Sequence, residues 1–123
     1  PVMLSPSMPL AYGTSTATVD FTLPTTLVHD NDARKNLSGV MVLVTGDANF
    51  DESVRYTGSG NDRDAILARI SGIIPTNSVS GYWPEDANMD GVVRYTGSNN
   101  DRDVVLQSIG GIVPTNTRVA SLP

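Results

Sequence analysis

The residues best suited to chemistry in this chain of 123 residues lie in two nearly identical acidic stretches. The first, GDANFDESVRYTGSGNDRD, covers residues 46–64, and the second, EDANMDGVVRYTGSNNDRD, covers residues 85–103. In each stretch, oxygen-bearing side chains occupy alternate positions, which we number 1, 3 and 5. Side chains spaced in this way can turn inward around a hard cation such as calcium. We therefore expect a cation in each copy, because carboxylates so close together repel one another.

Position 1 is Asp47 in the first copy and Asp86 in the second. Position 7 would supply a main-chain carbonyl, so its side chain can differ between the copies. Gly91 at position 6 suits a sharp bend, whereas Glu52 at the same position is a departure that is expected to weaken or strain the first site. The candidate ligands for two calcium ions are Asp47, Asn49, Asp51, Ser53, Asp62, Asp64, Asp86, Asn88, Asp90, Val92, Asp101 and Asp103.

Two interpretations of these stretches remain open at this point. Loops rich in aspartate and asparagine are often simple turns, with the side chains bonded to their own main chain. Duplication and charge favour calcium, because ten of the 13 acidic residues lie between residues 45 and 116. Two calcium ions would change the formal net charge from −5 to −1.

The acidic stretches belong to a longer internal repeat. Residues 47–77 and 86–116 align without a gap and share 21 of 31 residues, which is typical of a duplicated supersecondary unit. Each copy predicts a polar loop, a helix of about ten residues and a Pro-Thr-Asn exit. Helices this short are unstable alone, so we expect the two to pack against each other with approximate two-fold symmetry. Valine at position 8 of each loop predicts a short pairing between the two loops.

The ends of the two helices have clear signals. Asn61 and Asn100 are suitable N-caps, and an aspartate three residues later favours the helix dipole. Gly72 and Gly111 can end the helices.

The N-terminal part predicts a small β-rich segment. The alternation of residues 17–23 is typical of a half-buried strand, and the apolar run at residues 40–44 is typical of a buried one. Between them, residues 29–39 predict a short helix that Asp30 or Asp32 caps and Gly39 ends. The expected fold class is therefore α+β, with a β-rich segment at residues 1–44 and a duplicated calcium-binding module at residues 45–123.

The duplicated loops and helices resemble dockerins, which carry two EF-hand-like calcium loops that are each followed by one helix. The resemblance covers residues 47–113. A dockerin loop closes with an acidic ligand at position 12, where this chain has Gly58 and Gly97. The segment RYTGSGN looks like an insertion of about four residues, which would make Asp62 and Asp101 the closing carboxylates. The competing candidates are Asp64 and Asp103, which also have the capping role.

A second resemblance concerns location. The strings VRYTGSNNDRD and GGIVPTNTR, with LSGVMVLVTGDAN upstream and a terminal Leu-Pro, are similar to the C-terminal regions of large secreted or surface proteins of Bacteroidota. This resemblance implies an extracellular or cell-surface protein and a lengthened dockerin-like repeat. It implies no activity.

The duplicated Arg-Tyr-Thr triplet has two interpretations. In dockerins, positions 10 and 11 help to recognise the cohesin partner, and tyrosine and arginine are favoured at interfaces. Alternatively, the triplet braces the longer loop, with arginine near the carboxylates and tyrosine over the helix. The residues concerned are Arg55, Tyr56, Thr57, Arg94, Tyr95 and Thr96.

Several function classes are excluded or disfavoured. The sequence contains no set of nucleophile and base, no phosphate loop and no cysteine, so we expect a protein that is not an enzyme. Its acidic balance disfavours nucleic acid, and no apolar run is long enough to span a membrane. We expect a calcium-binding structural or assembly module, such as a filament or adhesin subunit that associates through β-strand pairing. The alternative is a docking module that binds a cohesin-like receptor.

Overall fold

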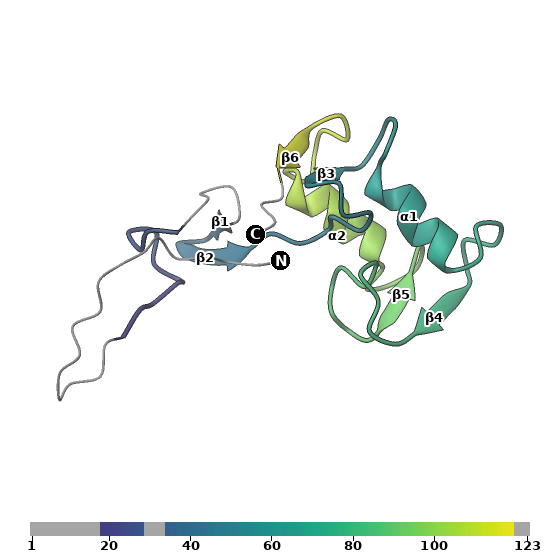
Figure 1. Ribbon diagram of the computed structural model, residues 1–123, viewed down its shortest axis with the longest axis horizontal. Helices are drawn as coiled ribbons and strands as arrows, with labels where there is room; N and C mark the ends of the chain where they lie inside the picture. The colour runs from purple at the N-terminus through teal and green to yellow at the C-terminus, as the bar shows by residue number, and fades with distance from the viewer. Residues whose placement is uncertain (1–17, 29–33, 120–123) are drawn as a thin grey trace. The chain divides into compact units, whose positions relative to one another are not determined.

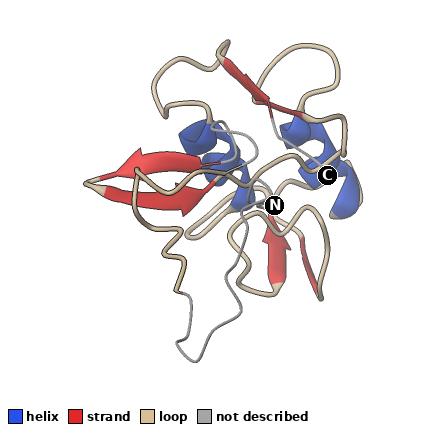
Figure 2. Ribbon diagram, turned by 60° about the vertical axis from the view of Figure 1, so that its left-hand side comes forward, coloured by secondary structure: helices blue, strands red, loops and turns tan. Residues whose placement is uncertain are grey.

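The computed structural model describes residues 18–28 and 34–119, which belong to two units that are treated separately below. The first unit holds the described residues up to Val44, and the second begins at Thr45. The described residues form two helices and six short strands, and the strands pair into three antiparallel two-stranded sheets (Figures 1 and 2). The chain is therefore a small mixed α/β protein.

The first unit contains a β-hairpin of β1 (Arg34–Leu37) and β2 (Val40–Leu43). Ser38 and Gly39 connect the strands with φ values of 52° and 93°, which is the left-handed conformation that a two-residue hairpin turn requires. The predicted helix is thus wrong over residues 34–39, because this turn allows the flanking residues to pair. The candidate caps Asp30 and Asp32 lie outside the described residues.

The segment before the hairpin turns back on itself instead of extending. The carboxylate of Asp20 accepts hydrogen bonds from the main-chain N–H and the hydroxyl of Thr22, at 2.9 and 2.6 Å. The predicted strand at residues 17–23 is therefore wrong over its described part, because an aspartate turn competes with the extended chain. The strand predicted at residues 40–44 is confirmed as β2, but Val40 is 47% exposed and only Val44 is buried.

A buried arginine organises this turning segment. The guanidinium of Arg34 donates to the carbonyl oxygens of Phe21, Leu23 and Thr26 at 2.8, 3.2 and 2.7 Å. Only 3% of the Arg34 surface is exposed. Main-chain oxygens thus solvate a cation that water cannot reach, and they hold the loop beside β1.

The second unit repeats one plan twice, with a spacing of 39 residues. The first copy runs through β3 (Ser53–Arg55), α1 (Asp62–Arg69) and β4 (Ser78–Ser80). The second runs through β5 (Val92–Arg94), α2 (Asp101–Ser108) and β6 (Thr117–Val119). The helices contact each other, as the repeat predicts (Figure 1).

The strands of the two copies are exchanged. β3 pairs with β6, and β5 pairs with β4, so the strand that follows each helix pairs with the loop strand of the other copy. Two equivalent hydrogen bonds support this exchange, from the hydroxyl of Thr57 to the carbonyl of Pro114 and from Thr96 to Pro75, both at 2.9 Å. The predicted pairing of the two loop strands with each other is therefore wrong, because each loop strand pairs with the strand that follows the helix of the other copy.

The core of this unit lies between the helices and the loop strands. Val54 and Val93, which were expected to mediate loop pairing, are fully buried. Ile66 and Val105 from the middle of each helix are also fully buried. The remaining buried apolar side chains of residues 45–119 are Ala48, Ile70, Ala87 and Ile109. Each copy therefore contributes four equivalent side chains to one small core.

The predicted N-caps of the two helices are confirmed. The side-chain oxygen of Asn61 accepts a hydrogen bond from the main-chain N–H of Asp64 at 2.9 Å, and Asn100 does the same for Asp103 at 2.9 Å. At the other end of α1, Gly72 takes φ 75° and donates its N–H to the carbonyl of Leu67. Both helices thus begin where the sequence predicts, but they end at Arg69 and Ser108, three residues before the predicted glycines, because Ser71 and Gly110 already take positive φ values of 93° and 115°.

Candidate functional site

The first half of each acidic loop, residues 47–51 and 86–90, is folded around its own side-chain oxygens. Asp47 accepts the main-chain N–H of Asp51 on one carboxylate oxygen and that of Glu52 on the other, both at 3.1 Å. The side-chain oxygen of Asn49 accepts the same N–H of Asp51 at 2.9 Å. Because Asp47 and Asn49 share one donor, their oxygens converge inside the loop.

The second acidic loop has the same arrangement. Asp86 accepts the N–H groups of Asp90 and Gly91 at 3.1 and 2.7 Å, and Asn88 accepts the N–H of Asp90 at 2.8 Å. Position 5 also caps its own turn, because Asp90 accepts the N–H of Val92 at 2.9 Å. Two separate stretches of sequence therefore bring positions 1 and 3 together in one common geometry.

The first residue of each helix supplies a further carboxylate to the loop. Asp62 is fully buried, and its two oxygens accept the main-chain N–H groups of Ala48 and Arg55, both at 2.7 Å. Asp101 is also fully buried and accepts those of Asn88 and Arg94 at 3.2 and 2.8 Å. These aspartates, which we call the helix aspartates, join both ends of each loop to its helix.

The competing pair, Asp64 and Asp103, has a different position. Asp64 accepts a hydrogen bond from the side-chain amide of Asn61 at 2.8 Å, and Asp103 accepts one from Asn100 at 2.9 Å. Their side chains are 66% and 52% exposed. Of the two candidate pairs, the structure thus brings the helix aspartates to the loops and leaves Asp64 and Asp103 in the caps.

The helix aspartates and Asp47 carry unfavourable charge. Burial raises the pKa of Asp62 to about 6, and the neighbouring charge of Asp47 adds to this effect, although three main-chain N–H donors oppose it. Burial also raises the pKa of Asp101, with a contribution from the charge of Asp86. The pKa of Asp47 is raised as well, first by burial and then by the charge of Asp51. A cation beside these groups would lower their pKa values and relieve the repulsion.

Each loop already contains one positive group. The guanidinium of Arg55, at position 9, forms an ion pair with the carboxylate of Asp51 at position 5. In the second loop, the Nη1 atom of Arg94 lies 2.6 Å from the Oδ2 atom of Asp90. This arrangement agrees with the interpretation that arginine braces the loop near the carboxylates.

The asparagine at position 3 bridges the loop to the segment that returns to the helix. The side-chain amide of Asn49 donates to the carbonyl of Gly60, and that of Asn88 donates to the carbonyl of Asn99, both at 2.7 Å. The amide oxygen at position 3 therefore faces the inside of the loop while its nitrogen holds the loop closed.

The loops could hold a hard cation only if amide and main-chain carbonyl oxygens act as ligands together with carboxylates. Within residues 18–28 and 34–119, no three acidic or histidine side chains gather closely enough to hold a metal by themselves. Calcium in either loop would need the amide oxygen of position 3 and main-chain carbonyls in addition to carboxylates, which is usual for this ion. Carboxylate oxygens that accept one N–H keep further lone pairs for such a ligand.

The remaining residues of the Arg-Tyr-Thr triplets have partners within the chain. The ring of Tyr56 lies under the guanidinium of Arg63, with 5.3 Å between the carbon Cζ and the ring centroid, and Tyr95 is related to Arg102 in the same way at 5.2 Å. The threonine that follows each tyrosine donates to a proline carbonyl, as described above. The contacts of tyrosine with the helix agree with the bracing interpretation.

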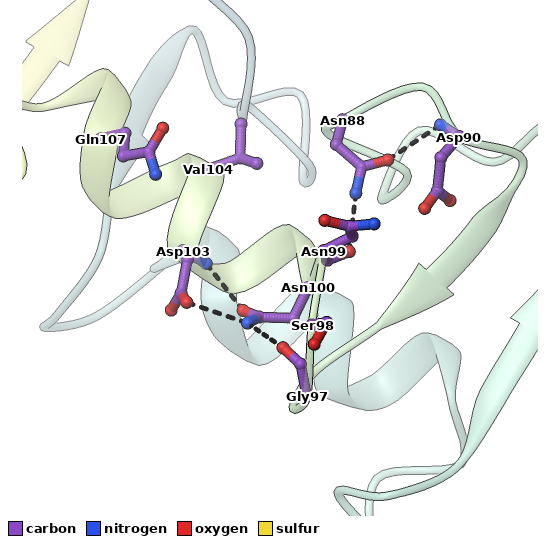
Figure 3. A pocket seen from close by; sticks show the side chains of 9 residues that line it. All are labelled: Asn88, Asp90, Gly97, Ser98, Asn99, Asn100, Asp103, Val104 and Gln107. Carbon is purple, nitrogen blue, oxygen red and sulfur yellow. Dashed lines mark hydrogen bonds between the residues drawn. The ribbon is translucent and has the colours of Figure 1, made fainter.

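A polar pocket of about 480 Å³ lies beside the second loop (Figure 3). Asn88 and Asp90 from the loop line it on one side, and Asp103 and Gln107 from α2 line it on the other. Figure 3 shows the carboxylate of Asp103 directed toward the amide of Asn100, away from the loop oxygens. The pocket therefore separates the loop carboxylates from the capping aspartate.

Sequence reasoning missed the residues that join the two copies near the helix ends. Arg69 forms a double hydrogen bond with Glu85, at 3.0 Å for both contacts, and lies over the ring of Trp83 at 4.2 Å. At the equivalent place in α2, the hydroxyl of Ser108 donates to the carbonyl of Thr45 at 2.6 Å. Arg69 and Ser108 occupy equivalent positions, and each holds the residues just before the acidic loop of the other copy. Because the two side chains differ, the repeat did not indicate this shared role.

Comparison with known proteins adds no family to this geometry. No protein-family model matches the chain, and no curated protein or solved structure shows significant similarity to it. In the described residues, no helix is long and apolar enough to cross a membrane.

Proposed function

We propose that residues 45–119 form a calcium-stabilised structural module of an extracellular protein, with one Ca²⁺ in each acidic loop. The observation that supports this most directly is the repeated convergence of oxygens at positions 1 and 3, each time beside a buried helix aspartate. Two loops have kept this geometry although 10 of the 31 aligned residues differ.

In this proposal, calcium acts on folding and not on a substrate. The ion would take the side-chain oxygens of positions 1, 3 and 5, the carbonyl of position 7 and the helix aspartate. It would supply the positive charge that lowers the pKa values of these carboxylates, so that loop closure and metal binding become one event. No catalytic role is proposed for any residue.

The two loops differ in backbone strain at position 6. Glu52 at position 6 takes φ 66°, which is costly for a residue with a side chain, whereas Gly91 takes φ 83° freely. This difference agrees with the expectation that position 6 strains the first loop.

The test is a comparison of thermal melting in EDTA, in calcium and in magnesium. We expect the Tm of EDTA-stripped protein to rise as calcium increases from about 0.1 to 10 mM, with a smaller rise in equal magnesium. Identical melting in EDTA and in about 10 mM calcium would contradict the proposal.

A docking module is the second candidate, and one observation favours it. Ile73 and Ile112 occupy equivalent places after the two helices and are 86% and 87% exposed. Apolar side chains this exposed at duplicated positions are suited to contact a protein receptor. Sedimentation analysis separates the two uses, because an assembly subunit forms oligomers as its concentration rises, whereas a docking module stays monomeric until its receptor is added.

A further inference from the structure

The arginine at position 9 is the part of each acidic loop that the calcium proposal leaves unexplained. Calcium-binding loops concentrate negative charge, yet here a guanidinium is paired with the carboxylate at position 5 in both copies. Both arginine side chains are 33% exposed, and the partner carboxylates are 35% and 32% exposed. The pairs are thus partly withdrawn from water. Their attraction therefore exceeds that of a fully solvated surface pair.

The contact uses a particular oxygen of position 5. In the second loop, the Oδ1 atom of Asp90 already accepts the N–H of Val92, and Arg94 binds the other oxygen, Oδ2. In the first loop, Asp51 divides its two oxygens between the N–H of Ser53 and the guanidinium of Arg55 in the same way. The arginine therefore occupies the oxygen that the loop main chain leaves available to a cation.

The same arginine also contacts the helix aspartate through its main chain. The N–H of Arg55 donates to the Oδ2 atom of Asp62, while its side chain reaches Asp51. The return segment lies close to the ion pair, since a Cβ atom built at Gly60 would be 3.3 Å from Asp51 and 3.5 Å from Arg55. One residue thus connects the two acidic sides of the loop.

We propose that Arg55 and Arg94 are internal counterions that hold the loops closed without metal and that calcium must displace from position 5. This inference deepens the proposed function and rests on it. It predicts that removing the guanidinium makes the metal-free protein less stable and, at the same time, makes calcium bind more tightly. These opposite effects distinguish a displaced counterion from a residue that simply supports the loop.

The test compares Arg94→Gln with Arg102→Gln as a charge-matched control. Both substitutions remove one positive charge from the second copy, but Arg102 pairs with Asp103 and Tyr95 and not with a loop carboxylate. Arg55→Gln and Arg63→Gln form the same pair of variants in the first copy. Each EDTA-stripped protein is melted without metal and titrated with calcium by calorimetry.

We expect Arg94→Gln to lower the metal-free Tm and to tighten calcium binding at one site by about fivefold or more, with little change in Arg102→Gln. If wild type binds calcium and Arg94→Gln binds it with equal or lower affinity, the inference is overturned and the calcium function stays intact. If Arg94→Gln binds calcium and wild type does not, the inference is supported and the calcium function of wild type is contradicted. An absence of calcium binding in every protein would overturn both.

Discussion

The main-chain N–H of Arg55 lies 2.7 Å from the buried carboxylate of Asp62, and together they fasten the end of the first acidic loop to the first residue of α1. Arg94 and Asp101 make the same contact in the second copy at 2.8 Å. Each loop is therefore tied to its helix through a charged group that water does not reach. The stability of the second unit should depend strongly on the charge and shape of these two aspartates.

Replacing the helix aspartate should be costly even without calcium. In Asp62→Asn, one oxygen becomes an amide nitrogen, which faces a main-chain N–H donor instead of accepting from it. We expect a loss of about 1–3 kcal/mol in the free energy of unfolding, measured in urea with EDTA at about pH 5, where the raised pKa of Asp62 keeps its carboxyl largely neutral and the substitution removes little charge. Asp64→Asn is the matched control, because Asp64 is exposed and should cost less than about 1 kcal/mol. Equal losses in the two variants would contradict this role of Asp62.

The metal-free protein should become more stable as the pH falls from 7.5 to 5. The pKa of Asp62 is raised to about 6, so the folded state binds more protons than the unfolded state in this range. The free energy of unfolding therefore decreases as the pH rises through the folded pKa, and Asp62 accounts for at most about 1.4 kcal/mol of the change between pH 5 and 7.5. The raised pKa values of Asp47 and Asp101 act in the same direction.

Urea unfolding in EDTA at several pH values measures this effect. Saturating calcium should reduce or reverse the pH dependence, because a bound cation lowers the carboxylate pKa values. Stability in EDTA that increases steadily from pH 5 to 7.5 would show that these carboxylates are not destabilising when charged.

Strain at position 6 of the first loop should be removable. Glu52 takes φ 66° where the second loop has Gly91. We expect Glu52→Gly to stabilise the protein by about 0.5–1 kcal/mol, because the release of strain exceeds the added freedom of the unfolded chain. The reciprocal control, Gly91→Glu, should destabilise by a similar amount, since a Cβ atom at Gly91 meets no neighbour within 4 Å and only the backbone angle opposes it. A loss of stability in Glu52→Gly would mean that the side chain has another role.

The exchange of strands between the copies should depend on the threonine contacts. Thr57→Val keeps the shape of the side chain and removes the hydrogen bond to Pro114. We expect a loss of about 0.5–1.5 kcal/mol, and the same for Thr96→Val, which faces Pro75. The Tm of each variant is compared with that of Thr76→Val. Thr76 lies in the exit segment, and its hydroxyl has no described contact with the other copy. If Thr57 and Thr96 serve only a partner, neither variant will change Tm relative to that control.

Local signals in the sequence were sufficient for the helical half of each repeat. Asn61 and Asn100 cap the helices because their side chains reach the third helical N–H, and this depends only on residues three apart. The buried positions of Ile66 and Val105 likewise follow from the apolar pattern of one short segment. Such features need no knowledge of distant parts of the chain.

Features that depend on competition between segments could not be predicted in this way. The loop strand β3 had two possible partners, and the choice of β6 depends on contacts between residues more than 60 positions apart. At residues 18–23, the alternating pattern resembled a strand, but the carboxylate of Asp20 bonds two residues ahead and turns the chain. For the hairpin, the pair Ser38-Gly39 before the apolar run of β2 was a usable turn signal, but the polar sequence of β1 and the capping pattern obscured it.

A calcium titration of EDTA-stripped protein by calorimetry is the decisive test of calcium binding. We expect two ions per chain for wild type and one for Asp86→Ala, with circular dichroism showing that the variant remains folded. A loss of the same site in Asp103→Ala would transfer the closing role to the capping aspartate. If wild type released no heat up to about 10 mM calcium and melted as it does in EDTA, the duplicated loops would be turns closed by their own hydrogen bonds and arginines, and the calcium function would be wrong.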